Sequence, residues 1–313
     1  MSVSLAFVFP GQGSQSVGML DVWSGQSAVT ALLQQADQAL GEPLSALIAQ
    51  GPAESLALTV NTQPAMLLAG LAACLAWRDA GGPEPVAVAG HSLGEYTALT
   101  AAGAFAPGDA VRLVRLRAQA MQEAVPVGVG AMAAILGLSD ELVRQACSEA
   151  AGQGEVVEAA NFNAPAQVVI AGHRAAVERA CERARALGAK RALPLPVSAP
   201  FHSSLLRPAG ERLAVFLESV PLEPPRHQLV NNIDAAVEFD PIRIRDALVR
   251  QAWGPVRWVE VVQRLVYLGV THVVEMGPGK VLAGLVSRID KSLKVSAVHD
   301  PASLEAALKE CGQ

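Results

Sequence analysis

The sequence predicts an α/β protein in which helices pack on a parallel sheet and a smaller domain is inserted into a larger one. Short apolar segments, such as residues 4–9, alternate with longer helical patterns. A turn with the spacing G-x-S-x-G connects a predicted strand to a predicted helix at residues 90–94. Further along, the predicted order changes to β-α-β-β-α-β, which is typical of a ferredoxin-like domain. We therefore expect a large domain formed by residues 1–127 and 199–313, and a small domain at 128–198.

The composition is compatible with a large buried core. Of the 313 residues, 51% are hydrophobic and 17% are charged, while only 4% are aromatic, which suits closely packed helices on a sheet. The net charge of −5 argues against binding to nucleic acid. The four cysteines are far apart and show no C-x-x-C spacing, so we expect neither disulfides nor a metal site, and a reducing compartment.

No contact with a membrane is expected. The N-terminus has no basic segment before its first apolar residues, so it does not have the pattern of a signal peptide. The longest apolar stretch, residues 65–77, is shorter than the roughly 18 residues needed to cross a bilayer, and it is expected to form a buried helix. These features predict a cytoplasmic protein.

The first strand runs into the loop PGQGSQ at residues 10–15. Its glycines allow the backbone to approach a ligand closely and Gln12 adds an amide, but an ordinary β-to-α loop explains the segment equally well. The spacing matches neither a Walker A loop nor a dinucleotide-binding loop. The segment NTQP at 61–64 predicts the start of the buried helix, with Asn61 or Thr62 as its cap. Two more helices are predicted before it, at residues 26–40 and 43–50.

The turn GHSLG has the pattern of a nucleophile elbow. Residues 85–89 predict a buried strand before it, and helical spacing begins at Leu93. The crowding of strand and helix around Ser92 requires positions without a Cβ on both sides, which Gly90 and Gly94 provide. The alternative is a tight turn with a hydroxyl helix cap. The flanking strand and helix favour the elbow, in which the backbone N–H of Leu93 faces an oxyanion.

The next predicted helix, residues 108–124, places one arginine on its apolar face. At about 100° per residue, Arg117 lies with the apolar residues, whereas Arg112 and Arg115 lie on the opposite side. A buried guanidinium needs an anionic partner. Arg117 therefore either pairs with an internal carboxylate, extends to the surface, or holds the carboxylate of a substrate.

The small domain is predicted from alternating strands and helices. Its second helix carries a run of arginines that continues into Lys190 and Arg191. Such a run is usually a solvated face, but on an acidic protein it could also dock an acidic partner. The predicted strands are 131–138, 156–162, 167–171 and 191–197, and the predicted helices are 140–150 and 174–187.

One of six histidines, His202, follows a proline-fixed bend at the return to the large domain, where a general base is plausible. Its position alone does not distinguish His202 from the other five histidines as the candidate general base. Glu275 ends a predicted strand, either as an acid or, as we favour, to fix the Gly-Pro-Gly turn that follows. The remaining predicted strands are 229–232 and 271–275, and the remaining helices are 205–217, 242–251, 256–268 and 281–289.

Taken together and in order, these motifs resemble the malonyl-CoA:acyl carrier protein transacylase family of bacterial fatty-acid synthesis. Acyltransferase domains of polyketide synthases share most of the set. Each motif alone is weak or moderate evidence, but the ordered set is specific and covers nearly the whole chain. The matching segments are FPGQGSQ at 9–15, GHSLGE at 90–95, Arg117 followed by MQEA at 121–124, APFH at 199–202, and VEMGPG at 274–279.

The resemblance implies an α/β-hydrolase-like large domain with an inserted ferredoxin-like domain. It also implies a covalent mechanism with Ser92 as the nucleophile and His202 as its base. The backbone N–H groups of Gln12 and Leu93 would form the oxyanion hole, and Arg117 would bind the malonyl carboxylate.

Two glutamines complete the implied site. The backbone carbonyl of Gln251 would orient the catalytic histidine, so that no acid completes a triad, and Gln63 would line the same pocket. In this family Leu after the nucleophile and Phe before the histidine accompany malonyl rather than methylmalonyl substrates, and Leu93 and Phe201 match this pattern.

The implied substrate is malonyl-CoA and the implied partner is acyl carrier protein, with no bound cofactor and a monomeric enzyme. We expect the acidic carrier to dock near Lys190 and Arg191. A discrete acyltransferase of a polyketide pathway is the main alternative, followed by a serine thioesterase or esterase. A binding module with an inactive site is disfavoured by the intact Ser92, Arg117 and His202.

Overall fold

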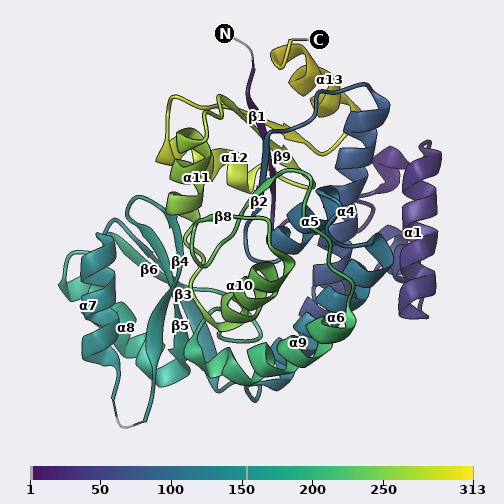
Figure 1. Ribbon diagram of the computed structural model, residues 1–313. Helices are drawn as coiled ribbons and strands as arrows, with labels where there is room; N and C mark the ends of the chain where they lie inside the picture. The colour runs from purple at the N-terminus through teal and green to yellow at the C-terminus, as the bar shows by residue number, and fades with distance from the viewer. Residues whose placement is uncertain (1–2, 153, 313) are drawn as a thin grey trace.

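The chain folds around two separate β-sheets, which the computed structural model describes for residues 3–152 and 154–312 (Figure 1). The larger sheet has the order β10-β9-β1-β2-β7-β8, and only its edge strand β8 is antiparallel to its neighbour. The predicted α/β fold with a parallel sheet is therefore confirmed. The strands are β1 (Leu5–Phe9), β2 (Ala87–Gly90), β7 (Gln228–Val230), β8 (Val237–Glu238), β9 (His272–Met276) and β10 (Lys294–Val298).

Helices cover both faces of this sheet, so the side chains of its central strand β1 are buried on both sides. Phe7 and Phe9 of β1 pack into one core, and Ala6 and Val8 pack into the other. The helices are α1 (Ser27–Leu40), α2 (Leu44–Gln50), α3 (Ala53–Leu56), α4 (Thr59–Asp79), α5 (Gly94–Ala101), α6 (Pro107–Glu123), α9 (Arg207–Ser219), α10 (Pro241–Trp253), α11 (Trp258–Tyr267), α12 (Val281–Ile289) and α13 (Pro301–Glu310), with short 3-10 turns at Asp21–Trp23 and Ser204–Leu206.

The smaller sheet is antiparallel and has the order β4-β5-β3-β6. Together with two helices it forms a separate body with its own apolar core, seen in teal at the left of Figure 1. The elements follow each other as β3 (Gly130–Leu136), α7 (Asp140–Ala150), β4 (Val157–Ala164), β5 (Gln167–His173), α8 (Arg174–Ala186) and β6 (Arg191–Pro194), in the predicted β-α-β-β-α-β order.

Helix α4 is buried, as predicted, but it begins earlier than the sequence suggested. The helix starts at Thr59, so Pro64 lies inside it rather than in its first turn. The side chains of Asn61 and Thr62 do not cap the helix; they donate to backbone carbonyls of the preceding turn. In the described part of the chain α4 is the one helix long and apolar enough to cross a membrane, and 83% of its most apolar window is buried inside the protein, as in a core helix.

Two C-terminal elements were missed. Strand β10 is an edge strand with mixed burial, so it lacks the apolar run that marks the central strands. Helix α13 begins with a capping box in which the side chain of Asp300 accepts from the N–H of Ser303, and the side chain of Ser303 accepts from the N–H of Asp300. The D-P-x-S spacing at its start was the available signal.

Candidate active site

The elbow between β2 and α5 requires both of its glycines. Ser92 at its tip has a φ of 54°, in the left-handed region. A Cβ on Gly90 would lie 1.9 Å from the carbonyl carbon of Gly94, and a Cβ on Gly94 would lie 2.0 Å from the carbonyl oxygen of Phe9. No side chain fits in either space, so the sequence G-x-S-x-G is dictated by the packing of this strand, turn and helix.

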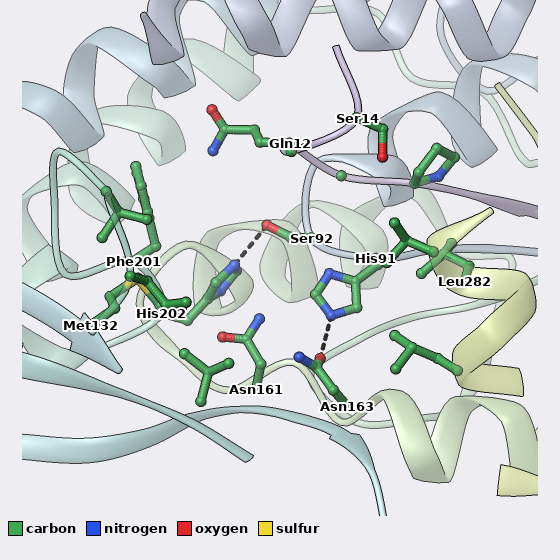
Figure 2. A pocket seen from close by; sticks show the side chains of 18 residues that line it. Gln12, Ser14, His91, Ser92, Met132, Asn161, Asn163, Phe201, His202 and Leu282 are labelled. Atoms are coloured by element: carbon green, nitrogen blue, oxygen red, sulfur yellow. Dashed lines mark hydrogen bonds between the residues drawn. The ribbon is translucent and has the colours of Figure 1, made fainter. Parts of the chain in front are cut away.

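The serine hydroxyl is hydrogen-bonded to a histidine from a distant loop. The distance from Ser92 Oγ to His202 Nε2 is 2.6 Å (Figure 2). The other ring nitrogen, Nδ1, lies 2.9 Å from the carbonyl oxygen of Gln251 and 3.1 Å from that of Gly254. Because both partners are acceptors, Nδ1 carries the proton and Nε2 is left to accept from the serine.

The environment of His202 favours the neutral ring. Burial, and then the positive charge of Arg117, lower the pKa of His202 from 6.5 to about 3, although the two backbone carbonyls oppose this shift. A neutral imidazole with a free Nε2 can take a proton from Ser92 at neutral pH. The histidine is held by carbonyl groups rather than by an Asp or Glu.

A buried arginine lies beside the same hydroxyl. Arg117 on α6 is 2% exposed, and one of its nitrogens lies 3.2 Å from Ser92 Oγ. It donates to the side-chain oxygens of Gln63, at 2.8 Å, and Gln251, at 3.0 Å. The guanidinium carbon also lies 5.1 Å from the centre of the Tyr96 ring.

All of these hydrogen-bond partners of Arg117 are neutral. No carboxylate of the described residues forms an ion pair with the guanidinium, its Nε has no hydrogen-bond partner, and burial lowers its pKa. The internal ion pair and the surface-extended side chain considered from the sequence are therefore both wrong for this residue. A buried cation with neutral partners is suited to receive an anion.

A pocket of about 320 Å³ opens in front of the serine, between the two sheets. Gln12, Phe201 and His202 line it from the large-sheet side, and Asn161 and Asn163 of β4 face them (Figure 2). Residues of α12 close one end of the pocket. The cavity therefore takes its walls from segments that are far apart in the sequence.

Gln12 and Gln63, two of the three predicted glutamines, are linked through a threonine. The side-chain oxygen of Gln12 accepts from Thr59 Oγ1 at 2.6 Å, and Gln63 Nε2 donates to the same Oγ1 at 3.1 Å. Gln63 was expected to line the pocket, but it is fully buried behind it and is not among the lining residues, whereas Gln12 is exposed at the edge of the pocket. Leu93 is 1% exposed and directly precedes α5. The structure thus brings together Ser92, His202, Arg117, Gln12, Gln63, Leu93, Gln251 and Phe201.

Two predicted residues lie away from this group of side chains. Lys190 and Arg191 are exposed at the corner between α8 and β6. Of the arginines before them on α8, Arg179 pairs with Glu155, and Arg183 with Glu149 of α7. Most of the basic run is therefore engaged locally.

The remaining candidate acid has a structural position. Glu275 is fully buried and its Oε2 accepts from the backbone N–H of Ala283 at 2.8 Å. It thereby holds the first turn of α12, the helix that closes the pocket.

Sequence reasoning missed four polar residues around the serine. His91 Nε2 lies 2.8 Å from Asn163 Oδ1, on the pocket wall. Asn232 Oδ1 accepts from the backbone N–H of Ser92 at 2.7 Å. Glu95, in the first turn of α5, is 1% exposed, and burial raises its pKa to about 7. A polar residue just after β7, beside the elbow strand, was the one signal for Asn232.

This fold and site define the class of the protein. The model of the acyl transferase domain matches residues 6–302. Malonyl CoA-acyl carrier protein transacylase of Salmonella typhimurium is 52% identical over 97% of this chain and 99% of its own length. The enzyme of that name from Bacillus subtilis is 44% identical over 97% of this chain and 96% of its own length.

Solved structures agree with these relatives. The acyl-carrier-protein S-malonyltransferase of Burkholderia pseudomallei 1710b superposes with a TM-score of 0.95 at 63% identity, covering 98% of this chain and 100% of that one. A malonyl-transacylase in complex with a type II PKS acyl-carrier protein has a TM-score of 0.95 at 49% identity, covering 98% and 99% of the two chains. The chain therefore belongs to the acyl transferase family and, within it, to the malonyl CoA-acyl carrier protein transacylases.

Proposed function

We propose that this protein transfers the malonyl group from malonyl-CoA to the phosphopantetheine thiol of acyl carrier protein, and so supplies extender units for fatty-acid synthesis. The observation that carries the proposal is Arg117, a buried cation with neutral partners that lies 3.2 Å from the Ser92 hydroxyl. A thioester whose acyl group ends in a carboxylate satisfies both residues at once. The names of the relatives agree with this substrate and acceptor.

In the first half-reaction Ser92 is acylated. His202 Nε2 takes the hydroxyl proton across the 2.6 Å hydrogen bond while Oγ attacks the thioester carbonyl. The backbone N–H groups of Gln12 and Leu93 stabilise the oxyanion. The tetrahedral intermediate then collapses, the C–S bond breaks, and the departing CoA sulfur takes the proton from His202.

In the second half-reaction the thiol of the carrier protein, rather than water, accepts the malonyl group. His202 takes the thiol proton, and the sulfur attacks the carbonyl of the malonyl-serine ester. Collapse releases Ser92, which recovers its proton from His202. Two side chains make every proton transfer in this ping-pong scheme, so the scheme needs no bound cofactor.

Arg117 selects the acyl group in this scheme. The malonyl carboxylate pairs with the guanidinium, beside the side chains of Gln63 and Gln251. An acetyl group would leave the buried cation unpaired, at a cost of about 3–5 kcal/mol.

Phe201 restricts the α-carbon of the substrate. Its side chain lines the pocket next to His202 and is 9% exposed. A methyl branch beside the thioester carbonyl would contact this ring, and Leu93 agrees with the same preference. Phe201→Ser should raise methylmalonyl turnover relative to malonyl turnover, and an unchanged ratio would refute the steric account.

We also propose to describe the molecule as an α/β-hydrolase-like large domain, residues 1–127 and 199–313, with a ferredoxin-like domain inserted at 128–198. The nucleophile elbow after β2 supports the first description. The small sheet has the strand order β4-β5-β3-β6, which is 2-3-1-4 when its strands are numbered from β3 along the chain. This order, with two helices, supports the second description.

Intact mass after brief exposure to malonyl-CoA tests the proposed function. A malonyl adduct is expected on the native protein, and it should disappear when carrier protein is added. Acetyl-CoA should give little adduct, and Ser92→Ala none. The exposed Ser16→Ala variant is the matched control and should behave as the native protein. Steady release of CoA without an adduct would instead identify a thioesterase.

A polyketide pathway is the second candidate, favoured by the relative bound to a type II PKS carrier. Discharging the adduct with carrier proteins of both pathways distinguishes them. Faster discharge by the fatty-acid carrier supports the first assignment, and the reverse order supports the second.

A further inference from the structure

The geometry points to Glu95 as a positioning residue that orients the Gln251 amide and, through it, the Arg117 guanidinium. This inference rests on the proposed function and deepens it, because it concerns how the acyl-selecting cation is held.

Glu95 is a buried carboxylate whose hydrogen-bond donors are both neutral. It lies three residues after Ser92 and is 1% exposed. Its Oε2 accepts from the backbone N–H of Asn232 at 2.9 Å and from Gln251 Nε2 at 3.0 Å. It does not line the pocket. A group in this place acts on the reaction only through the residues it holds.

The carboxylate decides which way the Gln251 amide faces. Gln251 Nε2 donates to Glu95 and, at 2.9 Å, to the carbonyl oxygen of Ser92, which leaves Oε1 to accept from Arg117 at 3.0 Å. A flipped amide would direct its NH₂ group at the guanidinium, donor against donor. It would also direct Oε1 at a carboxylate and a carbonyl, acceptor against acceptors. An ionised Glu95, together with the carbonyl of Ser92, therefore selects the orientation that anchors Arg117.

The same carboxylate is itself fixed by the elbow. Asn232, whose backbone N–H reaches Glu95, binds the N–H of Ser92 through Oδ1 and donates from Nδ2 to the carbonyl of Gly90 at 2.6 Å. Glu95 is thus connected to both backbone groups of Ser92, by way of Asn232 on one side and Gln251 on the other. The nucleophile and the cation share one rigid support.

This arrangement supplies a counter-charge without consuming the cation. A direct Glu95–Arg117 ion pair would satisfy the guanidinium and remove its need for a substrate carboxylate. With the neutral amide of Gln251 between them, the negative charge stabilises buried Arg117 while the guanidinium still faces Ser92 Oγ.

The test compares malonyl-CoA with acetyl-CoA in Glu95→Gln, which keeps the side-chain size and removes the charge. We expect kcat/KM for malonyl-CoA to fall about 10- to 100-fold and acetyl-CoA turnover to fall much less, so that malonyl-over-acetyl discrimination drops about tenfold. Equal losses on both substrates would indicate a merely structural role and would overturn the inference, as would no loss. Glu211→Gln, on the exposed face of α9, is the matched control and should leave both rates unchanged.

A double-variant comparison tests whether Glu95 acts through the amide. In a Gln251→Met background, Glu95→Gln should change discrimination less than twofold, because the amide it orients is gone. A further tenfold loss there would overturn the inference. If Glu95→Gln does not fold, Glu95→Asp replaces it; withdrawing the carboxylate by one methylene should reduce discrimination about threefold, and unchanged discrimination would contradict the inference.

Intact mass of the native protein separates the two levels of failure. If native protein forms no malonyl adduct, the proposed function fails. If native protein forms the adduct and the Glu95 variants prefer malonyl-CoA over acetyl-CoA as strongly as native protein does, only the positioning role fails.

Discussion

The two sides of the pocket differ in the kind of side chain that they present. On the large-sheet side, one buried network connects polar side chains, each of which binds another member or its backbone. Its members are Ser92, His202, Arg117, Gln251 and Glu95. On the opposite side, the small sheet presents apolar side chains and two asparagines. There, the buried Asn161 Oδ1 has no hydrogen-bond partner among the described residues.

The difference separates two tasks. A preorganised, water-poor network holds charge where the acyl transfer takes place, and it cannot change without leaving a charge unpaired. A wall of mainly apolar side chains makes no such demand, and it can accept the arm of a substrate that must enter and leave in each half-reaction. We therefore expect changes behind Ser92 to cost far more than changes in the small domain.

The largest effect is expected from Arg117→Met, which keeps the length of the side chain and removes the charge. Malonyl transfer should fall about 10²- to 5 × 10³-fold, corresponding to about 3–5 kcal/mol for a buried charge pair. Acetyl-CoA should gain relative to malonyl-CoA, because the unpaired cation no longer penalises it. Steady-state kinetics with both substrates measure this. Arg112→Met, at a half-exposed position of the same helix, should change neither rate; equal losses in the two variants would contradict the assignment.

The next effect compares the stability change caused by a glycine substitution in the elbow with the change caused by one in α12, at the end of the pocket. Gly94→Ala should destabilise the protein by about 3 kcal/mol, because its Cβ would overlap the Phe9 carbonyl. Gly284→Ala, in α12 with no atom within 4 Å of its Cβ, should instead stabilise by about 0.5–1 kcal/mol. Urea unfolding measures both. Equal stability of the two variants would mean that the elbow is softer than its packing indicates.

A third, smaller effect is the pH dependence of activity and stability that arises from the buried network around Ser92. Since the pKa of His202 is about 3, protonation of this histidine should give kcat/KM no acid limb near pH 6.5, and a limb near pH 7 that Glu95→Gln removes would belong to Glu95, whose pKa is about 7. The free energy of unfolding, in contrast, does depend on the protonation of His202 below pH 6.5. Below pH 6.5 the unfolded chain binds a proton at His202 that the native state refuses, so this contribution to stability declines as pH falls from 6.5 towards 3.

The pH effect is checked by comparing native protein with His202→Gln. The stability difference between them should change in favour of the variant between pH 7 and pH 5. A difference that is constant over this range would show that the ring is not buried in its neutral form.

How much of the site could be predicted depended on the range of the interactions. The elbow is local: strand, turn and helix lie within about twenty residues, so glycine spacing predicts it. The apolar-face position of Arg117 follows from helix periodicity. The pairing of Glu95 with Asn232 and Gln251 joins residues 137 and 156 positions apart, and no local pattern marks it. An acid in the first turn of a helix is typical of an exposed charge near the helix dipole, so the position of Glu95 in the sequence does not indicate a buried role.

The fold shows the same division. Central strands with continuous apolar runs and the amphipathic α6 were predicted with nearly correct bounds. The proline signal predicts a start of α4 near residue 61, whereas the helix begins at Thr59 and contains Pro64 in its interior. Edge strand β10 lacks an apolar run because only part of it is buried.

The smallest effect is expected at the exposed corner of the small domain, where Lys190 and Arg191 form no ion pair among the described residues. Reversing both charges should raise the apparent KM for the carrier about three- to tenfold and leave the KM for malonyl-CoA unchanged. Exposed charges contribute only about 1 kcal/mol or less each, and they act mainly on encounter. Added salt should shrink the difference, since these charges are screened by solvent ions.

The control for this pair carries the same charge change elsewhere. Lys291→Glu with Lys294→Glu, at the β10 edge of the large sheet, alters the net charge equally. If it raises the carrier KM as much, attraction is a property of total charge and the small domain has no docking role. If only the 190/191 pair does so, the small domain guides the carrier while the buried network selects the acyl group, and the two sides of the pocket can be altered independently.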